Sequence, residues 1–178
     1  SPGALDNATG VASVILAIDK LSAAIDIGVL ITSAEELGLA GARHFAAMRG
    51  ETGIGINCDT IDDAGKFICM ASGAKSRRLD EAIDRAASRL QVETVGVERL
   101  RNRGTAEGRI LRLRGMLPGI LADNMAFTDA GWESFTLSRG NIATLGYVHT
   151  SRDIADRVQG TGIAKAASFI AAIVEELA

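Results

Sequence analysis

The chain has 178 residues, enough for one globular domain with a sizeable core. Hydrophobic residues make up 47% and charged residues 23%, the composition of an ordinary globular protein. The net charge of −3 is too small to indicate nucleic acid or a membrane surface as a partner, and no apolar run is long enough to span a bilayer.

The first part of the chain predicts a helix followed by a buried strand. After Asn7 and Thr9, either of which can cap a helix, apolar residues recur at helical spacing. They are Val11, Val14, Ile15, Ile18 and Leu21. The continuous apolar run at residues 27–31 predicts a central strand that is covered on both faces.

The rest of the chain continues to alternate helices and strands. We expect helices at 37–48, 76–90 and 163–177, and strands at 53–58, 66–71, 132–137 and 142–148. Residues 96–119 carry a poor signal that fits short strands and loops. This alternation predicts a three-layer α/β/α domain. Cys58 and Cys69 lie in apolar runs, so we expect buried thiols, with a bridge between them left open.

Charged residues follow the predicted strands at the edge where ligands bind in open α/β sheets. Glu35 and Glu36 follow the strand at 27–31, Asp59 follows the strand at 53–58, and His149 follows the strand at 142–148. Asp6 lies just before the first helix. Each alone has an ordinary explanation, as a helix cap, a helix-terminal charge, an Asx turn or a loop histidine. Their joint placement at one edge favours a functional cluster.

Several motifs occur in an order that resembles the M28 family of zinc peptidases, which includes bacterial leucine aminopeptidases. The motifs are Asp6-Asn7-Ala8-Thr9-Gly10, Ala34-Glu35-Glu36-Leu37-Gly38-Leu39, Ile56-Asn57-Cys58-Asp59, Asp123-Asn124 with Gly131-Trp132, and His149-Thr150-Ser151-Arg152-Asp153. The resemblance implies a zinc-exopeptidase-like α/β/α sandwich with a mostly parallel mixed sheet. It also implies that residues 1–178 are one zinc peptidase domain, the carboxyl-terminal portion of a longer one, whose amino-terminal strands are missing.

The resemblance further implies a site with two Zn²⁺ ions and a role for each residue. Asp6 would bridge the ions, Glu36 and His149 would complete one, and Asp59 would bind the other. Glu35 would be the general base of an aminopeptidase that uses a zinc-bound hydroxide. The charges of two zinc ions would be balanced by three carboxylates and a bridging hydroxide, which a buried cluster requires.

Two departures from the family pattern stand out. The family has a His-x-Asp motif upstream of the position of Asp6, and its histidine binds the same ion as Asp59. No such motif occurs here, and His44 lies on a predicted helix, so we expect the second ion to bind weakly or not at all. Asp123-Asn124 replaces a frequent Asp-His, which makes Asp123 a weaker candidate for orienting a ligand. Tyr147 is either a hydrogen-bond donor to the reaction intermediate or a packed aromatic residue.

The resemblance leaves three functions to compare. The first is removal of amino-terminal residues from peptides that have a free amino terminus. The second is a glutaminyl-cyclase-like aminoacyl cyclotransferase with a single zinc. The third is a metal-depleted binding or structural domain, which the Glu35-Glu36 pair disfavours because a binding domain needs no general base. Side-chain specificity, compartment and homo-oligomerisation are left open.

Overall fold

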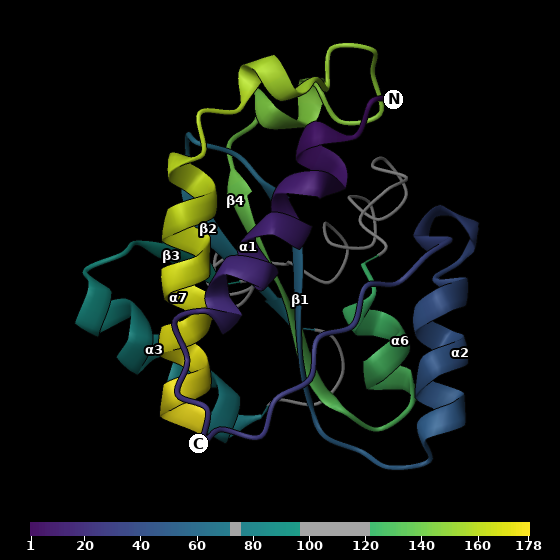
Figure 1. Cartoon of the computed structure of the whole chain (residues 1–178), viewed down its shortest axis with the longest axis vertical. Coiled ribbons are helices and arrows are strands. Elements are labelled where there is room, and N and C mark those ends of the chain that lie inside the picture. The colour runs from purple at the N-terminus through teal and green to yellow at the C-terminus, as the bar shows by residue number, and fades with distance from the viewer. Residues whose placement is uncertain (72–75, 97–121) are drawn as a thin grey trace, which may run out of the picture.

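A mixed sheet lies at the centre of the molecule (Figure 1). This computed structural model describes residues 1–71, 76–96 and 122–178. The strands in these ranges are β1 (Ile54–Ile61), β2 (Lys66–Ala71), β3 (Thr94–Gly96) and β4 (Glu133–Gly140). Their order is β1-β4-β2-β3, in which β1 and β4 are parallel, β2 and β3 are parallel, and β4 and β2 are antiparallel. The predicted mixed, mostly parallel sheet is confirmed.

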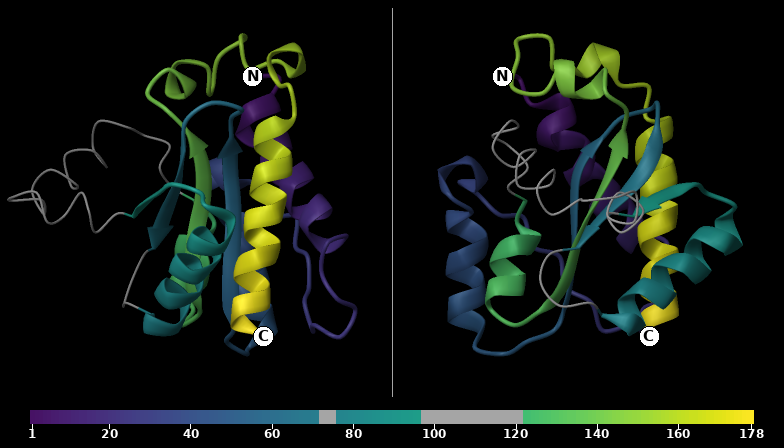
Figure 2. Two further views of the ribbon diagram at one scale, coloured as in Figure 1. Left: turned by 90° about the vertical axis from the view of Figure 1, so that its left-hand side faces the viewer. Right: turned by 180° about the vertical axis from the view of Figure 1, so that it is seen from behind.

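Helices cover both faces of this sheet (Figure 2). One face packs against α1 (Thr9–Ile18), α3 (Arg77–Leu90) and α7 (Thr161–Leu177). The other packs against α6 (Asn124–Asp129), and α2 (Ala40–Arg49) packs against α6. The three-layer α/β/α prediction is therefore confirmed. None of the helices in the described ranges is both long and apolar enough to cross a bilayer.

Alternation along β4 separates the two layers of the interior. Phe135 and Leu137 are fully buried in the cluster that includes Phe169 of α7. Between them, Thr136 points to the opposite face, where its hydroxyl donates to the side-chain oxygen of Asn124 at 2.9 Å. Burial of each large apolar side chain contributes about 1.5–3 kcal/mol, so the α7 face supplies most of the hydrophobic stabilisation.

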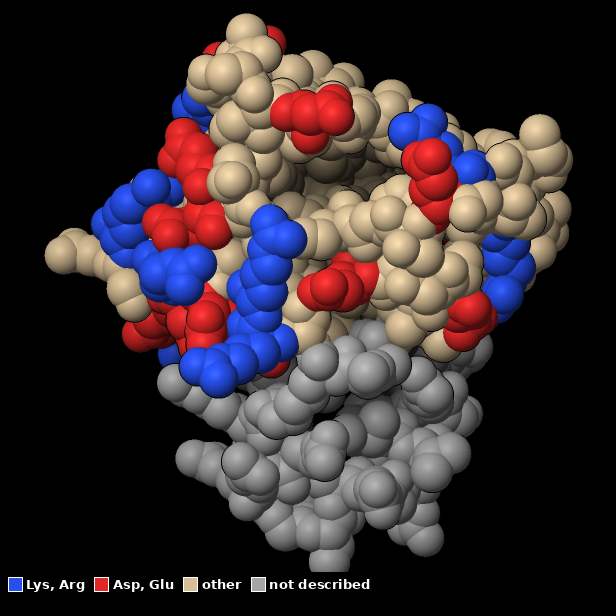
Figure 3. Space-filling view, turned by 90° about the horizontal axis from the view of Figure 1, so that it is seen from below, with Lys and Arg blue, Asp and Glu red and all other residues tan. Residues whose placement is uncertain are grey.

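The ends of α3 and α7 carry paired charges on their outer surfaces. Arg85 lies 2.8 Å from Glu176, and Arg89 lies 2.7 Å from Glu175. The view from below shows basic and acidic side chains side by side, next to a hollow that is bordered mainly by uncharged residues (Figure 3). Exposed pairs of this kind contribute about 0–1 kcal/mol each, so they add little to stability.

The predicted strand at residues 27–31 is wrong. The segment has no regular secondary structure, and Ile27, Val29 and Ile31 are 40%, 46% and 63% exposed. A strand requires a ladder of backbone hydrogen bonds, and β1, the edge strand nearest to this segment, pairs only with β4 in the described residues. The apolar run therefore contains side chains that favour burial but remain partly exposed.

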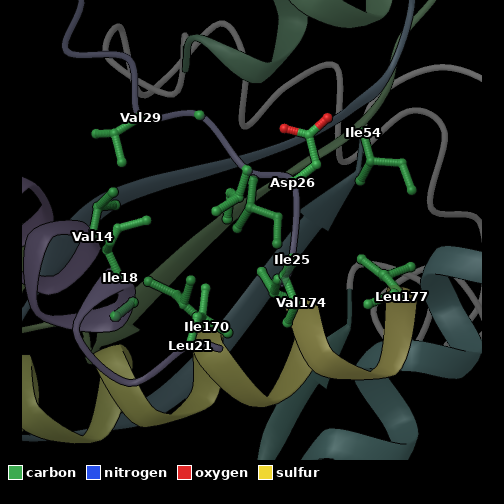
Figure 4. A pocket seen from close by; sticks show the side chains of 15 residues that line it. Val14, Ile18, Leu21, Ile25, Asp26, Val29, Ile54, Ile170, Val174 and Leu177 are labelled. Atoms are coloured by element: carbon green, nitrogen blue, oxygen red, sulfur yellow. The ribbon is translucent and has the colours of Figure 1, made fainter. Parts of the chain in front are cut away.

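An apolar groove separates this segment from β1 (Figure 4). Its volume is about 320 Å³. The walls come from α1, α7, β1 and the segment itself, with Val14, Ile25, Val29, Ile54 and Val174 among the lining residues. In Figure 4, Asp26 is the one charged residue among the labelled side chains. The groove explains why the residues on both of its sides are only partly buried.

The predicted strand at residues 142–148 is also wrong. A short 3₁₀ helix, η3 (Thr144–Gly146), lies there instead. The side-chain oxygen of Asn141 accepts hydrogen bonds from the backbone N–H groups of Ala143 at 2.8 Å and Thr144 at 3.3 Å. This Asx-type turn ends β4 and starts the 3₁₀ turn, so Ile142 is left 89% exposed. The prediction for residues 96–119 lies outside the described residues beyond Gly96.

Candidate metal centre

The backbone around Asp6 is held by a buried carboxylate from the far end of the chain. Asp6 lies in η1 (Ala4–Ala8), and its peptide bond to Asn7 is cis. Asp153 is fully buried and accepts hydrogen bonds from the backbone N–H groups of Leu5 at 2.6 Å and Asp6 at 3.2 Å. The backbone at Asp6 is therefore held by a residue 147 positions away.

Asn7 fastens the same segment to β1. Its side-chain nitrogen donates to the Cys58 carbonyl at 2.9 Å, and its oxygen accepts from the Thr60 N–H at 3.2 Å. Gly10 permits this approach, because a Cβ there would lie 2.4 Å from the Cys58 carbonyl oxygen. Asp59 lies between Cys58 and Thr60, the two residues that bond to Asn7, so Asp6 and Asp59 are brought to the same part of the sheet.

Glu35 and Glu36 lie in a separate 3₁₀ turn, η2 (Glu35–Leu37), and not at the start of a longer helix. Ala34, Gly38 and Leu39 all have positive φ angles of 58°, 83° and 62°. These left-handed residues interrupt the helix predicted at 37–48, so α2 begins only at Ala40. The turn therefore separates the two glutamates from α2 along the chain.

His149 brings the candidate ligands together. It lies in the loop after η3 with a φ of 62°. Its Nε2 atom is 2.9 Å from Asp6 Oδ2 and 2.6 Å from Glu36 Oε1. One ligand atom from each of these three residues lies within 4.8 Å of the others. In the described part of the chain this is the one such group of three that could hold a metal ion.

The donor set fits a zinc ion. Two carboxylates and one imidazole are ligands that zinc accepts, and three protein ligands leave the fourth tetrahedral position open for water or substrate. The side chains of His149 and Glu36 are 43% and 63% exposed, so this fourth position is reachable from solvent. The charge of such a site would be close to neutral, because two carboxylates balance one divalent cation.

Glu35 and Asp59 lie beside this group but outside it. Burial, followed by the negative charge of Asp59, raises the pKa of Glu35 to about 7. Burial and then the Asp6 carboxylate raise the pKa of Asp59 to about 6. No lysine or arginine in the described ranges pairs with any of these carboxylates. The site is therefore an acidic region with one imidazole, which electrostatically favours a cation.

Residues 1–174 match the model of peptidase family M28. The chain belongs to this family. Comparison of the sequence with curated proteins gives no significant match.

Solved structures that share this fold include aminopeptidases, one of which is named as a zinc enzyme. A zinc aminopeptidase from Bacillus subtilis is 20% identical with a TM-score of 0.75, and the match covers 99% of this chain and 42% of that one. An aminopeptidase from Aneurinibacillus sp. strain AM-1 is 21% identical with a TM-score of 0.68, covering 99% and 40%. The LapA aminopeptidase of Legionella pneumophila is 17% identical with a TM-score of 0.71, covering 99% and 47%. The M28 chain described here therefore spans less than half the length of each of these structures.

The remaining candidates of this M28 chain have their own contacts. Asp123 is buried and accepts a hydrogen bond from the Thr32 hydroxyl, and it contacts none of the three clustered residues directly. Its charge is one of the smaller causes that raise the pKa values of Glu35 and Asp59. His44 is exposed on α2, away from the cluster. The Tyr147 ring packs under the Arg157 guanidinium, whose Cζ is 3.4 Å from the ring centroid, so the alternative of a packed aromatic agrees with its contacts.

The contacts of Asp153, Asn7 and Thr32 were not predicted from the sequence. Each of the three holds a candidate residue or its backbone in place. Asp153 and Asn7 belong to the same motifs as His149 and Asp6, so their place in these motifs could have indicated a role at the site. No sequence pattern marks Thr32.

Proposed function

We propose that the protein is a zinc-dependent aminopeptidase, in which Asp6, Glu36 and His149 bind the metal and Glu35 is the general base. The observation that carries this proposal is the convergence of the three ligand atoms within 4.8 Å, although the residues come from three separate segments. The names of the structural relatives support zinc and an exopeptidase reaction. The chain spans less than half of the length of these relatives, so we also propose, by analogy, that the whole protein has this activity.

Glu35 is suited to the transfer of protons. Burial and the neighbouring carboxylates raise the pKa of Glu35 to about 7, so it is a stronger base than an exposed carboxylate and is suited to accept a proton from water and return it to a leaving amine. Zinc held by the three ligands would polarise the scissile carbonyl and acidify a bound water. The neighbouring residue, Glu36, faces His149 instead, so the two adjacent glutamates divide the tasks of proton transfer and metal binding.

The number of tightly bound ions is part of the proposal. A second ion would find Asp6 and Asp59 among the described residues, and Asp59 lies outside the group of three. The Asp59 carboxylate is already engaged with the Thr60 hydroxyl at 3.1 Å. We therefore expect one tight zinc site per chain and a second site that is weaker or absent.

Zinc titration of the purified protein tests the ligands. Glu36→Gln should weaken zinc binding by more than about 100-fold, since even residues that only support a metal ligand typically cost 10–100-fold when removed. Glu35→Gln should retain zinc and lose about 10²–10⁴-fold in hydrolysis of aminoacyl-nitroanilides. Glu51→Gln, an exposed glutamate outside the site, is the matched control. Equal zinc affinity in the wild type and Glu36→Gln would refute the assignment.

A single tight zinc site also favours the glutaminyl-cyclase-like alternative, which the same preparation can test. Peptides with amino-terminal glutamine distinguish the two reactions, because cyclisation retains the residue as pyroglutamate and an aminopeptidase releases it. We expect release of free amino acids. Pyroglutamyl product without released amino acid would establish the alternative and exclude the aminopeptidase.

A further inference from the structure

A buried arginine on the α7 side of the sheet has no acidic partner among the residues that the structure describes. Arg139 lies near the end of β4 and is 7% exposed. Its Cζ lies 5.6 Å from the centroid of the Phe67 ring, and one terminal nitrogen donates to the Asp62 carbonyl. A guanidinium has five N–H donors, and in the described residues no carboxylate lies within ion-pair distance of this one. Buried arginines are normally paired, so most of the binding capacity of Arg139 is unused.

Arg139 lines a cavity of about 590 Å³ between β2, the end of α3 and the first half of α7. Lys66 and Lys165 line the same cavity, together with Gln91, Ser168 and Glu93. Lys66 is paired with Glu93 at 2.5 Å, and Lys165 is exposed with no ion pair to any described residue. Three positive side chains and one negative one leave the cavity with an excess of two positive charges, in a protein with a net charge of −3. The lining residues include none of Asp6, Glu35, Glu36, Asp59 or His149.

We propose that this cavity binds a small molecule through an oxyanion, carried as a phosphate or a carboxylate, which is held by Arg139 and Lys165. The planar guanidinium matches two oxygens of such a group, and the surrounding burial strengthens these charge-assisted hydrogen bonds. Phe67, Leu90 and Val92 form apolar walls on which the uncharged body of the ligand can lie. The volume falls within the range of about 300–1,000 Å³ that is usual for small-molecule sites.

The test is calorimetric titration of the full chain with inorganic phosphate and, separately, with citrate. The protein is first treated with a chelator, so that binding of either anion to a metal at the candidate centre is excluded and the result does not depend on the proposed function. We expect saturable binding of at least one probe with a stoichiometry of one per chain. Phosphate alone identifies the phosphate form of the ligand, and citrate alone identifies the carboxylate form.

Three variants decide whether the anion lies in this cavity. Arg139→Gln should weaken binding by about tenfold or more, the fold-change expected on loss of a hydrogen bond to a charged group. Lys165→Gln should weaken it by a smaller factor, and Lys20→Gln, an exposed lysine elsewhere, should leave it unchanged. If Arg139→Gln does not fold, Lys165→Gln decides alone, because that side chain is exposed on a helix. The absence of saturable binding of both probes, or affinities that Lys165→Gln does not reduce, would overturn the proposal.

Discussion

Replacement of Asp153 should test how the candidate metal centre is held in place. Asp153 is fully buried, and its two carboxylate oxygens accept the backbone N–H groups of Leu5 at 2.6 Å and Asp6 at 3.2 Å. In Asp153→Ala both N–H groups lose their acceptor inside the protein. In Asp153→Asn one oxygen remains, but the amide N–H₂ group faces the second N–H, so one donor stays unpaired.

The magnitude follows from these two bonds. Hydrogen bonds to a charged group contribute about 1.5–3 kcal/mol each, which gives about 3–6 kcal/mol for the pair. Removal of the buried carboxylate also removes the cost of its dehydration, which offsets part of this amount. We expect the free energy of unfolding to fall by about 2–4 kcal/mol in Asp153→Ala and by about 1–3 kcal/mol in Asp153→Asn.

Urea unfolding, followed by the fluorescence of Trp132, measures this change, and competition with a chelator measures zinc affinity. If Asp6 is a zinc ligand, the loss of its backbone support should weaken zinc binding by about 10–100-fold. Asp156→Asn, an exposed acid three residues further on, should change neither quantity. An Asp153→Ala protein within about 0.5 kcal/mol of the wild type would show that these two hydrogen bonds do not stabilise the fold.

Further predictions concern α7 and the two cysteines. Asp63 accepts hydrogen bonds from the start of α7, among them the Gly162 N–H at 2.7 Å, so Asp63→Ala should lower the free energy of unfolding by about 1 kcal/mol in urea titrations, and no change would contradict its role as a cap. Partial burial acts to raise the pKa of Asp63, but the hydrogen bonds hold this pKa below its ordinary value of 3.8. The contribution of Asp63 to stability should therefore be complete above pH 3.8 and be lost as the pH falls further. Acid titrations of the wild type and Asp63→Ala can test this. Gly162→Ala should unfold at a much lower temperature than the wild type, because a Cβ there would lie 2.3 Å from the Asp62 carbonyl oxygen. A Cβ at Gly146 would have nothing within 4 Å, so Gly146→Ala should melt close to the wild type. Equal melting temperatures of the two variants would contradict this packing. Burial raises the pKa values of Cys58 and Cys69 to about 12, so neither thiol should react with a thiol reagent at pH 8 until urea unfolds the chain, and rapid labelling of the folded protein would contradict this.

The helices show how far local chemistry extends. The apolar stripe of residues 76–90 was sufficient to predict α3, and Ser76 caps it by accepting the Leu79 N–H at 3.1 Å. The apolar residues near the carboxyl end predicted α7 in the same way. Both signals are contained within one segment, because a helix satisfies its own backbone hydrogen bonds.

The strands show where local chemistry ends. Residues 27–31 and 54–58 both have the apolar character of a buried strand, yet only the second became one, because β4 pairs with it. A strand depends on a partner that no local pattern specifies, so a continuous apolar run indicates a need for burial and not the presence of a ladder. The strand prediction for residues 142–148 was wrong for a different reason, because the Asn141 side chain starts a turn that competes with extended backbone.

The same division holds for the candidate site. The motifs were enough to identify the family and to name the candidate residues, because they keep their chemistry and order in the linear chain. Which of these residues come together follows from the fold: Asp6, Glu36 and His149 converge, Asp59 lies outside their group, and Asp153 holds the backbone of Asp6. Distances between side chains depend on the packing of the whole sheet and its helices, and segments far apart in the chain contribute to that packing together.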